Sequence, residues 1–516
     1  MNERKAYPND LTDAQPIWKW AGLFAALAVS LALYLPTLSY YWVSEDFNFI
    51  GPMTIADVAD QFTFKPLPIF FYRPINFLSF FIDNQLWGQN PAGWRSTNLL
   101  LNLLTVALLW LLIYRLRGPL LAALVAVIFA VHPAHPGTVT WIVSRADVPA
   151  TMFMLACLIC FVAYVQNRYR RYYLLALAAM VLAILTKEVA VITPALLLLA
   201  DLCFFPQPGV SVHPDRKLPR INWPTLLRAK LLLHAPFIIL SAGYLLLRIW
   251  LYLAYHVGFG YGFNSPAKIY ENVAFDLGVI LGLPSAALIK GGLAIAVLLG
   301  FIIASVALAW WVGRLGWFGL GWLFVSLAPI ANITAYDTTS RIVYPATAGF
   351  AMLLAGALNK GLTNLNPELS AAIPPLKTQN SKLKTYFTAL LAVTIIAYGT
   401  WATTVHNDEW RVAGELNRSF LVQLKAIQPT LPSGSRLFFT NIPVIYKRAL
   451  AFNEGLRNAV RLTYNNTSLL VYDDFAYRRS SFMNELAGQS NKPTYYFHYS
   501  DDGTLKQYPS AAALMK

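Results

Sequence analysis

The stretch GGLAIAVLLGFIIASVALAWWV, residues 291–312, contains no charged side chain and indicates the architecture of the whole chain. A helix needs about 20 consecutive apolar residues to cross the hydrocarbon core of a bilayer. Similar runs recur along the sequence, which is 57% hydrophobic and 13% charged and has a mean hydropathy of +0.49. Soluble domains carry about 25% charged residues, so the composition predicts an α-helical polytopic membrane protein and not a soluble protein with a very large core.

These apolar runs predict about eleven transmembrane helices. Their expected limits are 17–38, 96–114, 119–133, 147–166, 172–186, 188–205, 231–255, 291–312, 315–333, 341–359 and 384–404. The runs 119–133 and 172–186 are short for a span. The segment 273–289 is also apolar, but Pro284 interrupts it, and we place it in the outer interface. The first run lacks a clear small-residue cleavage site, so we expect a retained span and not a cleaved signal peptide.

Lysine and arginine predict the orientation, because cytoplasmic loops are enriched in them. With the N-terminus in the cytoplasm, the inner segments hold about twice as many of these residues as the outer loops, and the C-terminus lies outside. This bias accounts for much of the net charge of +15, and no basic stretch with interleaved aromatic residues suggests a nucleic-acid partner. Cys157, Cys160 and Cys203 lie in apolar runs and indicate neither a disulfide framework nor a metal site.

The chain divides into two predicted domains. Residues 1–404 form a transmembrane domain with a large first outer loop at 39–95, and residues 405–516 form a small extracytoplasmic α/β domain. Within the tail, SRLFFTNIP (435–443) and TSLLVYDDF (467–475) are typical of short strands.

The first outer loop contains two segments with helix-like apolar spacing. They are TIADVADQF (54–62) and YRPINFLSFFIDNQLWG (72–88). We therefore expect the loop to be folded onto the membrane surface.

Polar residues gather at the expected outer ends of several spans, where charged side chains suggest a function. They are Glu45, Asp46, Arg73, His132, His135, Arg145, Asp147, Lys187, Glu188, Arg341 and Tyr344. The basic members stand on the side where lysine and arginine are disfavoured, so each needs compensation. The carboxylates could pair with them, or a phosphate-bearing ligand could do so. Structural ion pairs and interface anchoring are the alternative.

The adjacent carboxylates Glu45 and Asp46 suit general base catalysis at a water-accessible edge. The alternative is a pair of solvated acids at the start of a loop. We favour Asp46 as the base, because it lies one residue further from the apolar run and should ionise more readily. His132 and His135 have a spacing that can bind zinc on a helix. Pro133 and Pro136 disfavour a regular helix there, so we expect a hydrogen-bonding role or a contact with the acceptor, and no metal.

Four sequence blocks, which occur in a fixed order along the chain, are together more specific for a family than any one motif. They are FYRPINFLSFFIDNQLWGQNPAGWRSTNLLLNLL (71–104), VHPAHPGTVTWIVSRADVPATMFML (131–155), LAILTKEVAVITPALLLLAD (182–201) and RIVYPATAGF (341–350). The sequence resembles the membrane glycosyltransferases of the glycosyltransferase C superfamily, especially bacterial relatives of the O-mannosyltransferase-like proteins with transmembrane and tetratricopeptide repeats. The resemblance extends over about residues 40–420, including HNDEWRVAGEL (406–416). The repeats are absent, and the tail stands in their place.

This resemblance implies an integral protein of the bacterial plasma (inner) membrane that moves a hexosyl or pentosyl group from a polyprenyl-phosphate-linked donor, in contact with membrane lipid. An acid in the first outer loop then acts as base. The family has Asp-Asp there, and this chain has Glu first, so the role stays open between Glu45 and Asp46.

Three blocks match the family's blocks by position, which gives Arg145, Asp147, Lys187, Glu188, Arg341 and Tyr344. We combine these residues with Arg73 and the two histidines in one expected site. The donor phosphate would contact Arg73, Arg145, Lys187, Arg341 and Tyr344, while His132, His135, Asp147 and Glu188 support them. No nucleotide-binding loop is present, and no metal or other cofactor is expected. The acceptor, a protein or a glycan, stays open. The alternatives are a lipid-linked sugar transporter and a non-catalytic membrane subunit.

Overall fold

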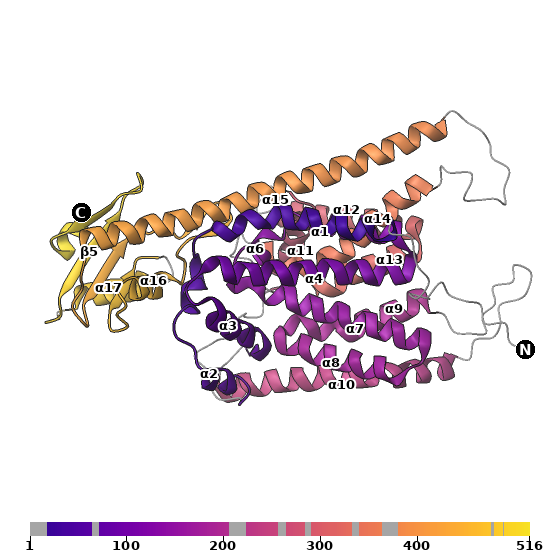
Figure 1. Cartoon of the computed structure of the whole chain (residues 1–516), viewed down its shortest axis with the longest axis horizontal. Coiled ribbons are helices and arrows are strands. Elements are labelled where there is room, and N and C mark those ends of the chain that lie inside the picture. Colours follow the sequence, from indigo (N-terminus) through magenta and orange to yellow (C-terminus); the bar gives the residue numbers. More distant parts are fainter. Residues whose placement is uncertain are drawn as a thin grey trace, which may run out of the picture.

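The computed structural model describes residues 18–63, 72–205, 223–255, 265–283, 290–332, 340–363, 380–475, 479–488 and 490–515. Helices that run side by side form a bundle, and a small domain with a β-sheet lies at one end of it (Figure 1). We call this end the sheet end of the bundle. The residues expected to carry function are all among those described.

A helix coincides with each of the eleven expected spans. These helices are α1 (Trp18–Tyr34), α4 (Pro91–Arg117), α5 (Pro119–Ala130), α7 (Asp147–Asn167), α8 (Arg170–Thr186), α9 (Thr193–Phe204), α10 (Trp223–Tyr255), α12 (Gly291–Val312), α13 (Arg314–Leu327), α14 (Tyr344–Thr363) and α15 (Asn380–Ile427). Among the described residues, seven segments are long and apolar enough to cross a membrane: Lys19–Ser39, Pro91–Arg117, Val143–Asn167, Lys230–Tyr255, Gly291–Val312, Arg341–Leu362 and Tyr386–Ile427. Eleven crossings therefore stay a prediction.

Burial separates the central helices from the peripheral ones. In the most apolar window of each segment, 67% of the residues around α7 and 72% of those around α14 are buried, against 17% in α12. Trp310 of α12 is 79% exposed, as expected for a side chain that faces lipid. Helices α13 and α14 approach closely through Gly319 and Gly349, where an added Cβ would lie 2.7 and 2.5 Å from the facing backbone carbonyl oxygen. Small residues allow this contact between helices in a membrane.

Local sequence signals explain where the helices begin and end. The Asn90 side chain accepts from the Ala92 N–H, and Pro91 occupies the first turn of α4, where no N–H partner is lost. Arg115 and Arg117 lie in the last turn of α4, at the negative end of the helix dipole. Gly118 then turns the chain into α5 with a φ of +91°, which few other residues adopt.

Short elements connect the bundle helices. They are η1 (Leu35–Ser39), η2 (Ser44–Asn48), α2 (Ile55–Asp60), α3 (Pro74–Trp87), α6 (Pro136–Val139), η3 (Val143–Ala146), η4 (Glu188–Ile192), α11 (Pro266–Ile280) and η6 (Ser340–Val343). The two helical segments predicted in the first outer loop are confirmed as α2 and α3. Helix α11 contains the first part of the apolar segment 273–289; Pro284 and the remainder lie outside the described residues.

The C-terminal sheet has the strand order β4-β1-β5-β6. Its strands are β1 (Arg436–Thr440), β4 (Leu470–Asp473), β5 (Thr494–Tyr499) and β6 (Leu505–Tyr508). Strand β1 pairs in parallel with β4 and β5, and β5 pairs antiparallel with β6, so the predicted mixed α/β character and both predicted strands are confirmed. The other elements of this domain are β2 (Ile445–Tyr446), β3 (Ala449–Leu450), α16 (Leu456–Thr463), α17 (Arg479–Ala487) and α18 (Ala511–Leu514).

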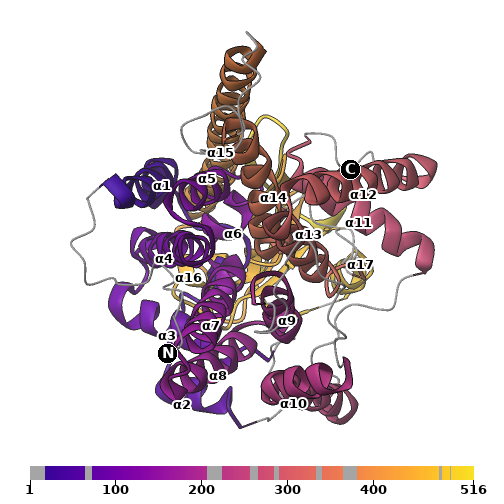
Figure 2. The same ribbon diagram turned by 90° about the vertical axis from the view of Figure 1, so that its right-hand side faces the viewer.

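Helix α15 joins the bundle to the sheet domain without a break (Figure 1). Seen from the end opposite the sheet, α15 lies at the edge of the bundle (Figure 2). It passes through the expected domain boundary at residues 404 and 405 and ends only at Ile427. One apolar cluster then packs the first loop, α15 and the sheet together; it includes Trp42, Phe47, Phe420, Phe439 and Phe452. The sheet domain is therefore packed directly on the loop that carries the two adjacent acids.

Candidate active site

Glu45 and Asp46 lie in η2, but their surroundings differ. Asp46 is 1% exposed, and both its oxygens accept backbone hydrogen bonds: Oδ2 from Val43 N–H at 3.2 Å and Oδ1 from Val143 N–H at 3.1 Å. Glu45 is only partly buried. Its Oε2 accepts from the Ser44 hydroxyl, and its Oε1 accepts from Asn453 Nδ2 at 3.2 Å.

This order of exposure is the reverse of the one expected from the sequence. Burial raises the pKa of Asp46 to about 7, although the charge of Arg95 and the backbone hydrogen bonds oppose the shift. Burial also raises the pKa of Glu45, and the Ser44 hydrogen bond and the charge of Arg341 oppose that shift. The expectation that Asp46 ionises readily because it lies further along the chain is wrong, since the chain folds back and encloses it.

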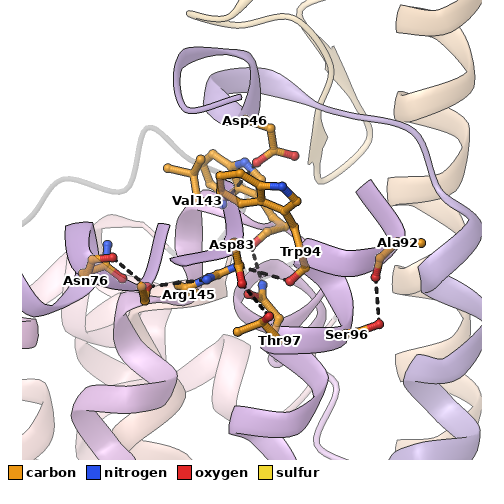
Figure 3. A network of polar contacts seen from close by, with 12 residues as sticks. Asp46, Asn76, Asp83, Ala92, Trp94, Ser96, Thr97, Val143 and Arg145 are labelled. Atoms are coloured by element: carbon orange, nitrogen blue, oxygen red, sulfur yellow. Dashed lines mark hydrogen bonds and ion pairs between the residues drawn. The ribbon is translucent and has the colours of Figure 1, made fainter. Parts of the chain in front are cut away.

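Arg145 lies in a closed network, drawn in Figure 3. Its guanidinium is fully buried and pairs with Asp83 Oδ2 at 2.5 Å. It also donates to the Trp94 carbonyl at 3.1 Å and lies 4.9 Å from the centre of the Phe80 ring. Asp83 in turn accepts from the Thr97 hydroxyl at 2.6 Å. The network joins α3, the start of α4 and η3.

Two further ion pairs form a second group at the same end of the bundle. Lys187 Nζ lies 2.5 Å from Asp147 Oδ2, and Arg73 pairs with Glu188 through both carboxylate oxygens, with 2.9 Å from Nε to Oε2. Of the two kinds of compensation that the sequence left open, the structure shows pairing with carboxylates for these two cations. The charge of Glu188 also acts on Lys187, so the four residues are one electrostatic unit.

Arg341 lies near Glu45 and not in the second group. Its guanidinium stacks 4.6 Å from the centre of the Trp141 ring, and its backbone carbonyl accepts from the Thr138 hydroxyl at 3.0 Å. Its side chain is half-buried, and its charge acts on the Glu45 carboxylate. The fold therefore brings an acid from η2 and a cation from η6 within electrostatic range of each other.

Tyr344 and the two histidines form a third, buried group. Tyr344 donates to Asn102 Oδ1 at 2.7 Å, and its ring lies 4.5 Å from that of His135. His135 Nε2 lies 2.9 Å from the Thr347 hydroxyl, which itself donates to the Tyr344 carbonyl, so His135 is the donor to Thr347.

His132 has a tautomer set by its neighbours. Its Nδ1 accepts from Ala134 N–H, which leaves Nε2 to donate to the Ile280 carbonyl at 3.0 Å. The expected irregular backbone around the prolines is confirmed, since 131–135 is not helical. Over the described ranges, no group of three or more His, Cys, Asp or Glu side chains could hold a metal ion.

The sequence interpretation missed Arg95 and Asp83. Arg95 is 2% exposed and donates to three backbone carbonyls, those of Tyr40 at 2.5 Å, Tyr41 at 2.8 Å and Thr140 at 3.2 Å. It thereby ties the segment before η2 to the end of α6. The available signal was its position: a cation at the expected outer end of a span needs a partner as much as Arg145 does.

Comparison with known proteins places this geometry in context. Residues 77–209 match the family described as dolichyl-phosphate-mannose-protein mannosyltransferase. The chain is 30% identical to the protein O-mannosyl-transferase Tmtc1 of Drosophila melanogaster over 36% of this chain and 22% of that protein, and 31% identical to the human protein O-mannosyl-transferase TMTC2 over 27% and 18%. The chain thus spans only about a fifth of each relative.

A solved structure extends the comparison to nearly the whole chain. The crystal structure of ArnT from Cupriavidus metallidurans bound to undecaprenyl phosphate covers 94% of this chain and 94% of its own, with 14% identity and a TM-score of 0.54. At this identity the likeness shows the fold. Together with the family match and the sequence relatives, this fold confirms the resemblance to glycosyltransferase C membrane proteins that the sequence blocks predict.

Proposed function

We propose that this chain is a membrane glycosyltransferase that moves a sugar from a polyprenyl-phosphate-linked donor to an acceptor at the outer face. One observation carries the proposal: a partly exposed carboxylate, Glu45, lies at the sheet end of the bundle, within electrostatic range of a half-buried cation, Arg341. We take this end as the outer one, as the distribution of lysine and arginine predicts. The protein would then be an integral protein of a bacterial plasma membrane.

We assign the role of general base to Glu45 and not to Asp46. A base must reach the proton that it removes, either directly or through one water molecule. Glu45 is accessible, whereas both oxygens of Asp46 are enclosed and accept backbone N–H groups. Asp46 instead positions η2 against η3, and through it the neighbouring Glu45.

The proposed step is a displacement at the anomeric carbon of the donor sugar, in which the acceptor replaces polyprenyl phosphate. An acceptor group loses its proton to the Glu45 carboxylate, and the bond between the acceptor and the anomeric carbon forms. The bond from the anomeric carbon to the phosphate oxygen breaks, and polyprenyl phosphate leaves with that electron pair. Arg341 stabilises the charge on the departing phosphate, as fixed cations do at developing anions.

The other cations at this end of the bundle take different roles in this proposal. Arg73 is 19% exposed and Lys187 is 11% exposed, so a phosphate oxygen could join their ion pairs. Arg145 and Tyr344 are fully enclosed, so we assign them to positioning. His132, His135, Asp147 and Glu188 support them. No metal or other cofactor is needed for the step, and chelation would test this.

The comparisons support the donor class and leave the sugar and the acceptor open. The structure of ArnT has undecaprenyl phosphate bound, and the family description names dolichyl phosphate mannose. A hexosyl or pentosyl group on a polyprenyl phosphate is the corresponding donor here, with a protein or a glycan as acceptor.

The test is transfer by the full chain in lipid bilayers. Purified protein is supplied with polyprenyl-phosphate sugars one at a time, together with membrane extracts as a source of protein and glycan acceptors. Transfer of labelled sugar that depends on Glu45 supports the proposal. Movement of the labelled lipid across the bilayer without transfer would instead identify a transporter, and neither activity with any donor would favour a non-catalytic subunit.

A further inference from the structure

A segment of the sheet domain reaches into the site. The backbone from Ala451 to Gly455 lies against η2, and the Ser44 N–H donates to the Ala451 carbonyl. Asn417 of α15 donates to the same carbonyl at 3.0 Å and to the Trp42 carbonyl at 3.2 Å. Three parts of the chain thus meet at one backbone oxygen, on the element that carries Glu45.

Individual residues of the segment 451–455 allow it to approach η2 closely. At Gly455 an added Cβ would lie 1.8 Å from the Ser44 carbonyl oxygen, so only glycine permits the observed approach. Asn453 has a φ of +33°, in a region that asparagine adopts more readily than most residues. The Phe452 ring stacks on Phe47 of η2, with 6.2 Å between the ring centres.

The segment is also anchored to α15. Arg448 pairs with Glu409 through both carboxylate oxygens, at 2.9 Å from Nε to Oε2 and 2.6 Å from NH2 to Oε1. Such a two-point pair fixes orientation as well as distance. Asn453 is therefore presented to η2 by a restrained backbone and not by a free loop.

We propose that the Asn453 side chain, carried by the sheet domain, is a positioning residue for Glu45, so that the sheet domain completes the active site. Its amide holds Glu45 Oε1 at 3.2 Å while the Ser44 hydroxyl holds Oε2. Two donors on opposite oxygens fix the plane of the carboxylate and favour its ionised form. The catalytic part of this inference rests on the proposed function; the positioning part does not.

The charged groups around Glu45 set the background for a test. They are Asp46 on the same element, Arg341 from η6 and Glu454 from the sheet domain. Replacing Asn453 by Asp keeps the size of the side chain and places a further negative charge next to the Glu45 carboxylate. Replacing it by Gly removes the amide and keeps the unusual φ accessible.

The experiment measures the pH midpoint of Glu45 in the full chain, without needing activity. A carbodiimide activates protonated carboxyl groups, so its coupling at Glu45, read by peptide mass spectrometry across pH, follows the titration. We expect Asn453→Asp to raise the midpoint by on the order of one pH unit, and Asn453→Gly by about half a unit. Asn465→Asp and Asn465→Gly are matched controls, because Asn465 also has a positive φ in the sheet domain but is exposed.

Unchanged midpoints in both Asn453 variants would overturn the proposal. A shift in them but not in the Asn465 controls supports it, even if the wild-type chain transfers no sugar, in which case only the proposed function falls. If the wild type is active, the acid limb of its rate profile should move with the midpoint while the KM for the donor stays unchanged.

Discussion

The Val143 N–H donates to Asp46 Oδ1 at 3.1 Å across 97 positions of sequence. The other oxygen of Asp46 accepts from Val43 N–H, so one carboxylate joins η2 to η3 and closes its own turn. This arrangement makes Asp46 a structural neighbour of the accessible Glu45. The two adjacent acids therefore have different roles: Asp46 holds the backbone in place, and Glu45 remains accessible.

Glu45→Gln and Asp46→Asn should therefore fail in different ways. General base catalysis contributes about 10²–10⁴-fold, so Glu45→Gln should lower the transfer rate by at least about a hundredfold while donor binding and thermal stability stay close to wild type. Asp46→Asn places an NH2 group against a backbone N–H and should lower stability as well as rate. Transfer assays and thermal unfolding in detergent measure both. Wild-type rates in both single variants and in the double variant would rule out the catalytic assignment.

Stability should depend on pH through Asp46. Its pKa rises from 3.8 to about 7 on folding, so the folded state holds the proton more tightly. The stability from this proton is complete below the unfolded pKa and is lost as the pH rises through about 7, a change of roughly 4 kcal/mol. The melting temperature of the wild type should fall between pH 4.5 and 7.5, relative to that of Asp46→Asn. Parallel curves for the two proteins would contradict this.

Breaking the Arg145–Asp83 pair should be more damaging than breaking the Arg73–Glu188 pair. Removing one partner of a buried pair costs about 3–5 kcal/mol, and the cost falls towards the roughly 0–1 kcal/mol of a fully exposed pair as solvent reaches the charges. Asp83 is 1% exposed and Glu188 is 30% exposed. Thermal unfolding of Asp83→Asn and of its control Glu188→Gln measures the difference. Equal stabilities would contradict this prediction. An Arg145→Ala variant that folds normally and loses donor affinity would instead make Arg145 a ligand for the donor.

Arg341→Ala should weaken use of the lipid-linked donor. A hydrogen bond to a charged group contributes about 1.5–3 kcal/mol, which corresponds to a loss of about ten- to hundredfold. Lys187→Ala should combine a smaller loss with lower stability, because Asp147 is then left without its partner. Arg411→Ala, which removes an exposed cation on α15, is the control. Transfer kinetics at varied donor concentration measure these losses. An unfolded Arg341→Ala protein would indicate that Arg341 has a structural role only.

The predicted orientation is open to cysteine labelling. In a background without Cys157, Cys160 and Cys203, a membrane-impermeant thiol reagent added outside should modify Asn465→Cys and leave Lys217→Cys unmodified. Asn465 is exposed on the sheet domain, and Lys217 lies in the longest expected inner segment. Labelling of Lys217→Cys alone would reverse the orientation and place the site on the cytoplasmic side.

The sequence by itself determined the helical architecture. Long apolar runs favour the bilayer, and within the bilayer a helix satisfies all backbone hydrogen bonds inside one segment. It also determined the two strands in the tail and the helices in the first loop, and it showed that Arg73 and Lys187 need compensation for their charge. Each of these follows from local composition or from charge at a known depth. The number of crossings did not follow, since α5, α8, α9 and α13 are shorter than the seven segments that are long and apolar enough to cross a membrane.

Tertiary structure alone decided how the polar residues divide. Asp46 and Glu45 are adjacent in sequence, yet the fold encloses one and leaves the other accessible, because Val143 and Asn453 approach from segments far along the chain. Arg145 likewise pairs with Asp83, which lies far from it in the sequence and close to it in the fold. Burial and hydrogen bonding depend on distances between segments that no local pattern encodes, and they set which carboxylate can take a proton.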